Sequence, residues 1–127
     1  MITKFSFLVV DDSYIDRIVT SMLIKNILNV TEVTQAAGGK EALEQLQQNT
    51  FGNKLILLLD IKMPVMDGFE FLDEYDKLPE GLKQNITIFM LSSTIDPDDI
   101  KKAEKNAYVR KILSKPLSVQ ELKAYLE

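Results

Sequence analysis

Three short runs of branched apolar residues, each closed by a polar side chain, constrain the fold of this 127-residue chain more than any other feature. The runs and the polar residues that close them are 7–10 with Asp11-Asp12, 55–59 with Asp60, and 86–91 with Ser92. Continuous apolar runs of this length are typical of strands in a parallel sheet that is covered on both faces. Because ligands bind at the carboxyl ends of such strands, the polar residues are expected to converge at one edge of the sheet.

Helical patterns of apolar residues lie between the expected strands along the whole chain. An alternation of strands and helices indicates βαβ units and therefore a parallel sheet. The segments at 32–36 and 110–113 are shorter or more polar than the three apolar runs, so they are expected at the sheet edges. The sequence thus predicts an α/β fold with a doubly wound, five-stranded parallel sheet in the order 2-1-3-4-5, a flavodoxin-like architecture with three layers.

The helix after the first strand is predicted to bury one apolar stripe against the sheet. The stripe consists of Ile15, Ile18, Val19, Met22, Leu23, Ile27 and Leu28. Further along, the segment from 79 to 84 is predicted to be a polar connection between a helix and the fourth strand.

Composition narrows the chemistry that is open to this chain. It contains neither His nor Cys, which excludes a Ser–His–Asp triad and disulfides and makes a typical zinc site improbable. The net charge of −4 argues against a general nucleic-acid binder. No apolar run approaches the roughly 20 residues of a membrane span, and no signal-peptide pattern opens the chain. We therefore expect a cytoplasmic protein that contacts neither nucleic acid nor a membrane.

The polar residues at the strand ends form a set with a definite chemistry. Asp11, Asp12, Asp60, Ser92 and a lone Lys115 before Pro116 would bring carboxylates, a hydroxyl and an ammonium together. Taken singly, the acids could cap a helix, the serine could belong to a turn, and the lysine could be solvated. Those explanations leave the convergence unexplained, and three gathered carboxylates repel one another unless a cation lies among them. The set therefore predicts a metal and phosphate site, with Mg²⁺ as the favoured metal.

In this order and at these strand ends, Asp11-Asp12, Asp60, Ser92 and Lys115-Pro116 resemble the receiver domain of two-component response regulators, the CheY-like family. The resemblance covers essentially the whole chain. Its most specific part is the segment 58–68, Leu-Leu-Asp-Ile-Lys-Met-Pro-Val-Met-Asp-Gly, which is similar to the phosphoacceptor strand and loop of that family.

The resemblance implies a role for each residue. Asp60 would be the nucleophile that takes a phosphoryl group from a phosphohistidine of a histidine kinase or phosphotransfer protein. Mg²⁺ would be held directly by Asp12 and Asp60, through water by Asp11, and by the main-chain carbonyl of Lys62. Lys115 would pair with a phosphoryl oxygen, and the Ser92 hydroxyl would bond the group after transfer. The family also implies a cis Lys115–Pro116 bond.

Signal output is expected at the surface formed by the fourth helix after Asp96, the fifth strand and the fifth helix. The basic residues there are Lys101, Lys102, Lys105, Arg110 and Lys111. They either complement the helix dipole and favour solubility or form a docking surface for an acidic partner. Ile112 stands where many receivers carry a switching aromatic residue, so the switching mechanism stays open.

Three other functions compete with the receiver interpretation. A flavodoxin-like FMN carrier would need a Ser/Thr/Gly-rich phosphate loop where this chain has Asp11-Asp12. A phosphatase of the haloacid dehalogenase type would need an acid two residues after the nucleophile, where this chain has Lys62. The runner-up is a protein-interaction module on a receiver fold that works without phosphorylation, although the acids and the lysine are all present here.

The domain organisation is predicted to be a single receiver domain over residues 1–127. The chain stops one helix after Lys115-Pro116, which leaves no residues for an output domain. The Met1 start and the acidic balance favour a stand-alone receiver over a piece of a longer protein. Such a module is not an enzyme in the ordinary sense, since it would catalyse only its own phosphorylation and dephosphorylation.

Overall fold

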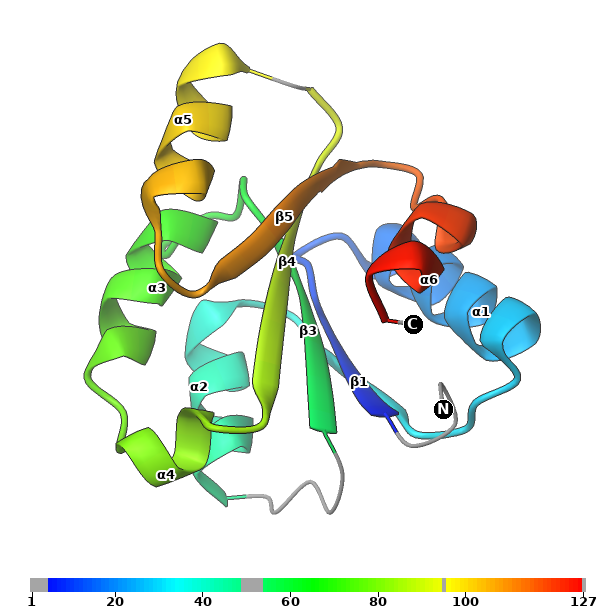
Figure 1. Ribbon diagram of the computed structural model, residues 1–127, viewed down its shortest axis with the longest axis horizontal. Coiled ribbons are helices and arrows are strands. Elements are labelled where there is room, and N and C mark those ends of the chain that lie inside the picture. Colours follow the sequence, from blue (N-terminus) through cyan, green and yellow to red (C-terminus); the bar gives the residue numbers. More distant parts are fainter. Residues whose placement is uncertain (1–4, 49–53, 95, 127) are drawn as a thin grey trace.

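A computed structural model describes residues 5–48, 54–94 and 96–126 of the chain. Its core is one sheet of five parallel strands in the order β2-β1-β3-β4-β5 (Figure 1). The strands are β1 (Phe5–Val10), β2 (Val33–Ala36), β3 (Lys54–Asp60), β4 (Ile86–Ser92) and β5 (Val109–Ser114). The doubly wound α/β fold predicted from the sequence is confirmed, strand order included.

Helices cover both faces of this sheet. They are α1 (Tyr14–Leu28), α2 (Gly39–Gln48), α3 (Gly68–Asp76), α4 (Glu80–Lys83), α5 (Pro97–Lys105) and α6 (Val119–Leu126). Figure 1 shows α1 and α6 on one side of the sheet and α2, α3 and α5 on the other. Within the part of the chain that the structure describes, no helix combines the length and hydrophobicity needed to cross a bilayer.

Alternate residues of the central strands pack into two separate hydrophobic cores, one on each face of the sheet. In β1, Phe7 and Val9 pack on the side of α1 and α6, whereas Leu8 and Val10 pack on the side of α2 and α3. All four side chains are fully buried. Because both faces of the strand are covered, the sequence shows a continuous apolar run instead of an alternation. The edge strands β2 and β5 are only partly buried, in keeping with their mixed sequences.

The buried stripe predicted for α1 is confirmed for Leu23 and Leu28, which pack in the core, but was wrong for most of its other members. The helix turns Thr20, Ser21, Ile24 and Leu28 to the core, while Ile15 is 67% exposed. Val19, Met22 and Ile27 are exposed as well. Apolar residues occur almost all around this helix, so their spacing does not select one face. The small side chains of Thr20 and Ser21 lie on the same buried side of the helix as Ile24 and Leu28. Ile15, Val19 and Met22, at helical spacing, are called the outer face of α1 below.

The polar connection before β4 contains the short helix α4, which the sequence analysis did not predict. Lys83, although charged, is 7% exposed. Its ammonium donates hydrogen bonds to the carbonyl of Asp76 at 2.9 Å and to the Tyr108 hydroxyl at 3.1 Å. These bonds satisfy a buried cation and thereby join α4 to the end of α3 and the start of β5.

Candidate functional site

The carboxyl ends of β1 and β3 bring three acids together. The register of these strands pairs Val10 with Leu59, so the next residues, Asp11 and Asp60, lie side by side. The carboxylate oxygens of Asp11, Asp12 and Asp60 lie within 4.8 Å of one another. Asp11 is 2% exposed and Asp60 5%, whereas Asp12 is exposed to solvent. The convergence of the acids predicted from the strand ends is therefore present in the structure.

Lys115 faces these acids from the turn that follows β5. Its backbone N–H donates to the carbonyl of Ser92 at 2.9 Å, which ties the turn to the end of β4. The Lys115–Pro116 peptide bond is cis, as the family resemblance implied. The Lys115 Nζ lies 2.8 Å from Asp11 Oδ2 and 3.2 Å from Asp60 Oδ1. The ammonium is thus held against the carboxylate that the sequence singled out as the nucleophile.

Burial and like charge shape the protonation of this site. The pKa of Asp60 is raised to about 6: burial is the largest cause, the charge of Asp11 adds to it, and Lys115 partly opposes both. Burial by itself would lower the pKa of Lys115, but hydrogen bonds to Asp11 and Asp16 and the charge of Asp60 outweigh it, so that pKa is raised. Lys115 therefore remains an ammonium at neutral pH. Its single positive charge does not balance the negative charge of the three clustered carboxylates when all are ionised.

The donor set fits a small, hard divalent cation. Carboxylate oxygens are the ligands that Mg²⁺ prefers, and this site offers three such groups. Asp11 already accepts hydrogen bonds at both oxygens, from the Ser13 N–H at 2.9 Å and from Lys115 at 2.8 Å. Asp12, by contrast, is open to solvent. This difference agrees with direct ligation by Asp12 and Asp60 and an indirect part for Asp11. Lys62 is the second residue after β3, and its side chain is exposed.

Ser92 ends β4 next to the acids, but its hydroxyl is engaged elsewhere. The β3–β4 register pairs Asp60 with Leu91, so Ser92 lies one residue beyond the partner of Asp60. The buried Ser92 Oγ donates a hydrogen bond to the carbonyl of Thr94 and accepts one from the Thr94 N–H at 3.2 Å. Another hydrogen-bond acceptor at the site must therefore compete with the carbonyl of Thr94 for the Ser92 hydroxyl.

One residue of the site, Asp16 in the first turn of α1, was missed by the sequence analysis. Its Oδ2 lies 3.1 Å from the Lys115 ammonium. An acid in the first helical turn has an ordinary explanation in the helix dipole, so its type and position gave no signal. Only the packing of α1 beside the β5–α6 turn reveals the contact.

Gly68, the first residue of α3, sets how closely that helix approaches Asp60. A Cβ at this position would lie 2.9 Å from the carbonyl oxygen of Asp60 and 2.8 Å from Met90 Cε. We expect Gly68→Ala to lower the free energy of unfolding by about 1–3 kcal/mol, because backbone atoms cannot yield to the added methyl. Gly81→Ala is the matched control, since nothing lies within 4 Å of its added Cβ. Equal urea midpoints for the two variants would contradict this close contact.

Comparison with known proteins agrees with the geometry of the site. The family model of the response regulator receiver domain matches residues 7–127. The chain belongs to the response regulator receiver domain family. Among curated relatives, it is 35% identical over 114 residues to the two-component response regulator ARR10 of Arabidopsis thaliana, covering 89% of this chain and 19% of that protein. It is 36% identical over 92 residues to the probable methanogenesis regulatory protein FilR2 of Methanothrix harundinacea, covering 70% of this chain and 57% of that protein.

Solved structures of receivers resemble the fold over almost its whole length. A response regulator receiver protein from Dyadobacter fermentans superposes with a TM-score of 0.89 at 33% identity, covering 96% of this chain and 94% of that one. The chemotaxis response regulator CheY4 of Vibrio cholerae gives a TM-score of 0.77 at 28% identity, covering 98% and 97%. The chain is thus a CheY-like receiver domain of the two-component type. It spans only part of the length of the two curated relatives described above.

Proposed function

We propose that Asp60 is the phosphoacceptor of a His-to-Asp phosphorelay. The observation that carries this proposal is the position of its buried carboxylate between two further acids and the Lys115 ammonium. A carboxylate oxygen of Asp60 attacks the phosphorus of a partner phosphohistidine. The new O–P bond forms as the N–P bond breaks, and the bonding electrons return to the imidazole nitrogen. The product is an aspartyl phosphate, and the donor is a histidine kinase or a phosphotransfer protein.

Each surrounding residue has a part in this transfer. Lys115 would hold a phosphoryl oxygen beside the acceptor, and Ser92 would donate its hydroxyl to another oxygen after transfer. Mg²⁺ held by Asp12, Asp60 and the carbonyl of Lys62, with Asp11 behind a water molecule, would supply charge stabilisation for the phosphoryl group. The chain would act as one receiver unit in the cytoplasm, with no reaction beyond its own phosphorylation and dephosphorylation and no nucleic acid or membrane as a partner.

Metal dependence tests this proposal. With acetyl phosphate as a small donor, phosphorylation measured by intact mass should require Mg²⁺ and should stop when a chelator is added. Asp12→Asn should remove most of the metal binding, because this acid is the exposed member of the cluster, and Asp11→Asn should have a milder effect. Phosphorylation that continues unchanged in the presence of the chelator would contradict the role of the metal.

The outer face of α1 is the surface that a protein donor would cover. The helix begins at Tyr14, two residues after Asp12. Ile15 therefore lies next to the carboxyl edge of the sheet, where Asp60 ends β3. A donor that presents its histidine to Asp60 must approach this edge. Contact with Ile15, Val19 and Met22 would then remove exposed apolar area from water.

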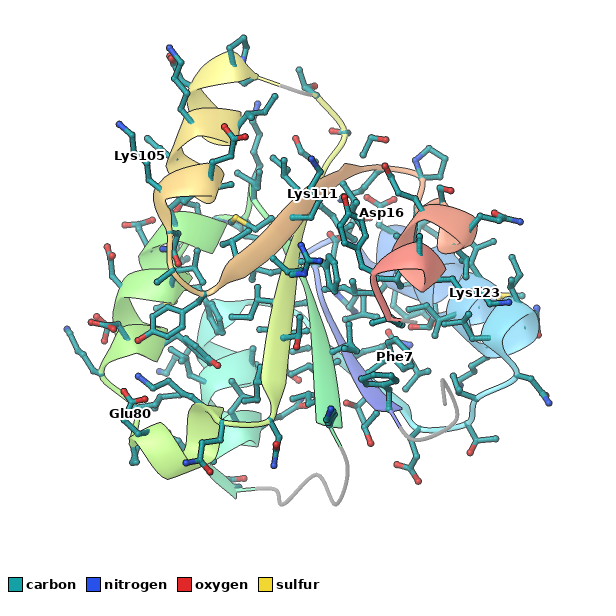
Figure 2. All side chains as sticks on the ribbon, in the orientation of Figure 1. Phe7, Asp16, Glu80, Lys105, Lys111 and Lys123 are labelled. Atoms are coloured by element: carbon teal, nitrogen blue, oxygen red, sulfur yellow. The ribbon has the colours of Figure 1, made fainter. Side chains whose placement is uncertain are left out.

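Output is proposed at the surface formed by α5, β5 and α6. A groove of about 370 Å³ lies between α5 and β5, and Ile100, Val109 and Ile112 are among its lining residues. Of the basic residues there, Lys102 lies over the Phe69 ring and Arg110 over the Tyr125 ring. Lys105 and Lys111 project from α5 and β5 on this side of the molecule (Figure 2). Together they would favour an acidic partner, with steering that weakens as salt rises.

Beryllofluoride, a phosphoryl analogue, should reveal whether the signal reaches this surface. Its binding at Asp60 should draw the Ser92 hydroxyl away from the Thr94 carbonyl and thereby move the loop that leads to α5. Amide chemical shifts should change in residues 98 to 113 of the wild type, whereas Ser92→Ala should bind the analogue with much smaller changes there. Shift changes confined to the loops after Asp12, Asp60 and Ser92 would show that this face does not carry the signal.

A phosphorylation-independent interaction module is the second candidate function. Ile112 favours it, because the aromatic side chain through which many receivers switch is missing at this position. Such a module would present the same surfaces with or without the analogue, so the chemical-shift experiment separates the two functions.

A further inference from the structure

We propose that Asp16 is a positioning residue that competes with the phosphoryl group for the Lys115 ammonium and so weakens phosphoryl binding at Asp60. The inference rests on the proposed phosphoacceptor function and deepens it. It starts from the 3.1 Å contact between Asp16 Oδ2 and Lys115 Nζ, which lies outside the three-acid cluster. Asp16 is labelled in Figure 2, and the ion pair joins the first turn of α1 to the turn between β5 and α6.

The ammonium of Lys115 donates hydrogen bonds to Asp11 and Asp16 and forms an ion pair with Asp60. An ammonium has three N–H donors, and here three carboxylates surround it: Asp11 at 2.8 Å, Asp16 at 3.1 Å and Asp60 at 3.2 Å. The lysine side chain is only 13% exposed, so little of it remains for water. A phosphoryl oxygen that binds Lys115 must therefore compete with these carboxylates for the ammonium.

Asp16 is the partner that gives up this contact at the lowest cost. Asp11 is 2% exposed and accepts a second hydrogen bond from Ser13, so its release would leave a buried charge unpaired. Asp60 carries the phosphoryl group and stays in place. The Asp16 side chain is 46% exposed, and it borders a groove of about 220 Å³ beside Lys115 and Pro116. Once released, its carboxylate can be hydrated there.

Electrostatic repulsion acts in the same direction. Asp16 adds a further carboxylate beside Lys115, next to the cluster of Asp11, Asp12 and Asp60. An incoming phosphoryl group adds more negative charge. Asp16 lies near this group and is not one of the acids proposed to hold the metal, so its charge repels the phosphoryl group. Neutralising Asp16 should therefore both free Lys115 and reduce the repulsion, so that the phosphoryl group is bound more tightly.

The test compares the affinity for beryllofluoride, in the presence of Mg²⁺, of the wild type and three variants by amide chemical-shift titration. Asp16→Asn should bind the analogue roughly two- to fivefold more tightly, the range expected for a partly exposed charge contact. Asp16→Glu keeps the charge and should bind like the wild type. Asp73→Asn removes an exposed acid on α3 and controls for the change in net charge.

Each outcome of the titration bears on a different claim. Tighter binding by Asp16→Asn alone supports the competition. Equal or weaker binding by Asp16→Asn, or equal tightening by Asp73→Asn, would overturn it while leaving the phosphoacceptor function intact. A wild-type protein that does not bind beryllofluoride at all would overturn the proposed function and this inference with it.

Discussion

Replacing Lys115 with Met should destabilise the metal-free protein by about 3 kcal/mol at pH 7, because the substitution leaves buried carboxylates without their cation. The Lys115 ammonium contacts Asp11 and Asp60, which are almost fully buried. Methionine keeps most of the volume of the side chain and removes only the charge and the hydrogen bonds. Urea unfolding monitored by circular dichroism would measure the change in the free energy of unfolding.

This destabilisation should depend on pH in a direction set by Asp60. Burial and the charge of Asp11 already raise the pKa of Asp60 to about 6, and the loss of Lys115 would raise it further. A carboxyl whose pKa is raised by folding binds more protons in the folded state than in the unfolded state. Stability is therefore lost as pH rises from the ordinary aspartate range through the raised pKa. The free energy of unfolding of the variant should approach that of the wild type near pH 4 to 5, close to the usual pKa range of aspartate. At pH 7, above the raised pKa, it should fall well below the wild-type value.

Two variants make this prediction specific. Lys111→Met removes an exposed lysine from the same strand region and should change stability by no more than about 0.5 kcal/mol. Adding Asp60→Asn to Lys115→Met should restore part of the lost stability at pH 7, because one uncompensated charge is removed. If Lys115→Met and Lys111→Met unfold at the same urea concentration at pH 7, the account of Lys115 as the cation of the site is wrong.

The fold and most of the site could be predicted because their signals are local in the sequence. A strand buried on both faces needs a continuous apolar run, and the residue that ends it lies at the ligand edge of the sheet. For that reason Asp11 and Asp60 could be placed side by side before their register was known. Lys115 contributed a weaker signal, since a single lysine near a chain end has many ordinary explanations.

The features that escaped prediction depend on packing between distant segments. Part of the buried face of α1 was missed because apolar residues surround the helix, and the small residues Thr20 and Ser21 lie on the side that meets the sheet. Asp16 was missed because its contact with Lys115 joins residues far apart in the chain. Lys83 lies in a polar sequence, yet hydrogen bonds to Asp76 and Tyr108 permit its burial. None of these arrangements follows from the spacing of residue types.

Asp60→Asn should abolish acyl phosphate formation completely. Asn keeps the shape of the side chain and loses the anionic oxygen that attacks phosphorus. Neither Asp11, which is held by Ser13 and Lys115, nor the exposed Asp12 can replace it, because Asp60 alone ends the central strand β3 and faces both of them. Asp73→Asn, on the exposed side of α3, is the control that should remain fully active.

The most direct test of the central claim is the intact mass of the protein after incubation with acetyl phosphate and Mg²⁺. The account predicts one added phosphoryl group on the wild type and on Asp73→Asn, and none on Asp60→Asn. A phosphoryl group retained by Asp60→Asn, or an unmodified wild type, would contradict the assignment of Asp60 as the phosphoacceptor.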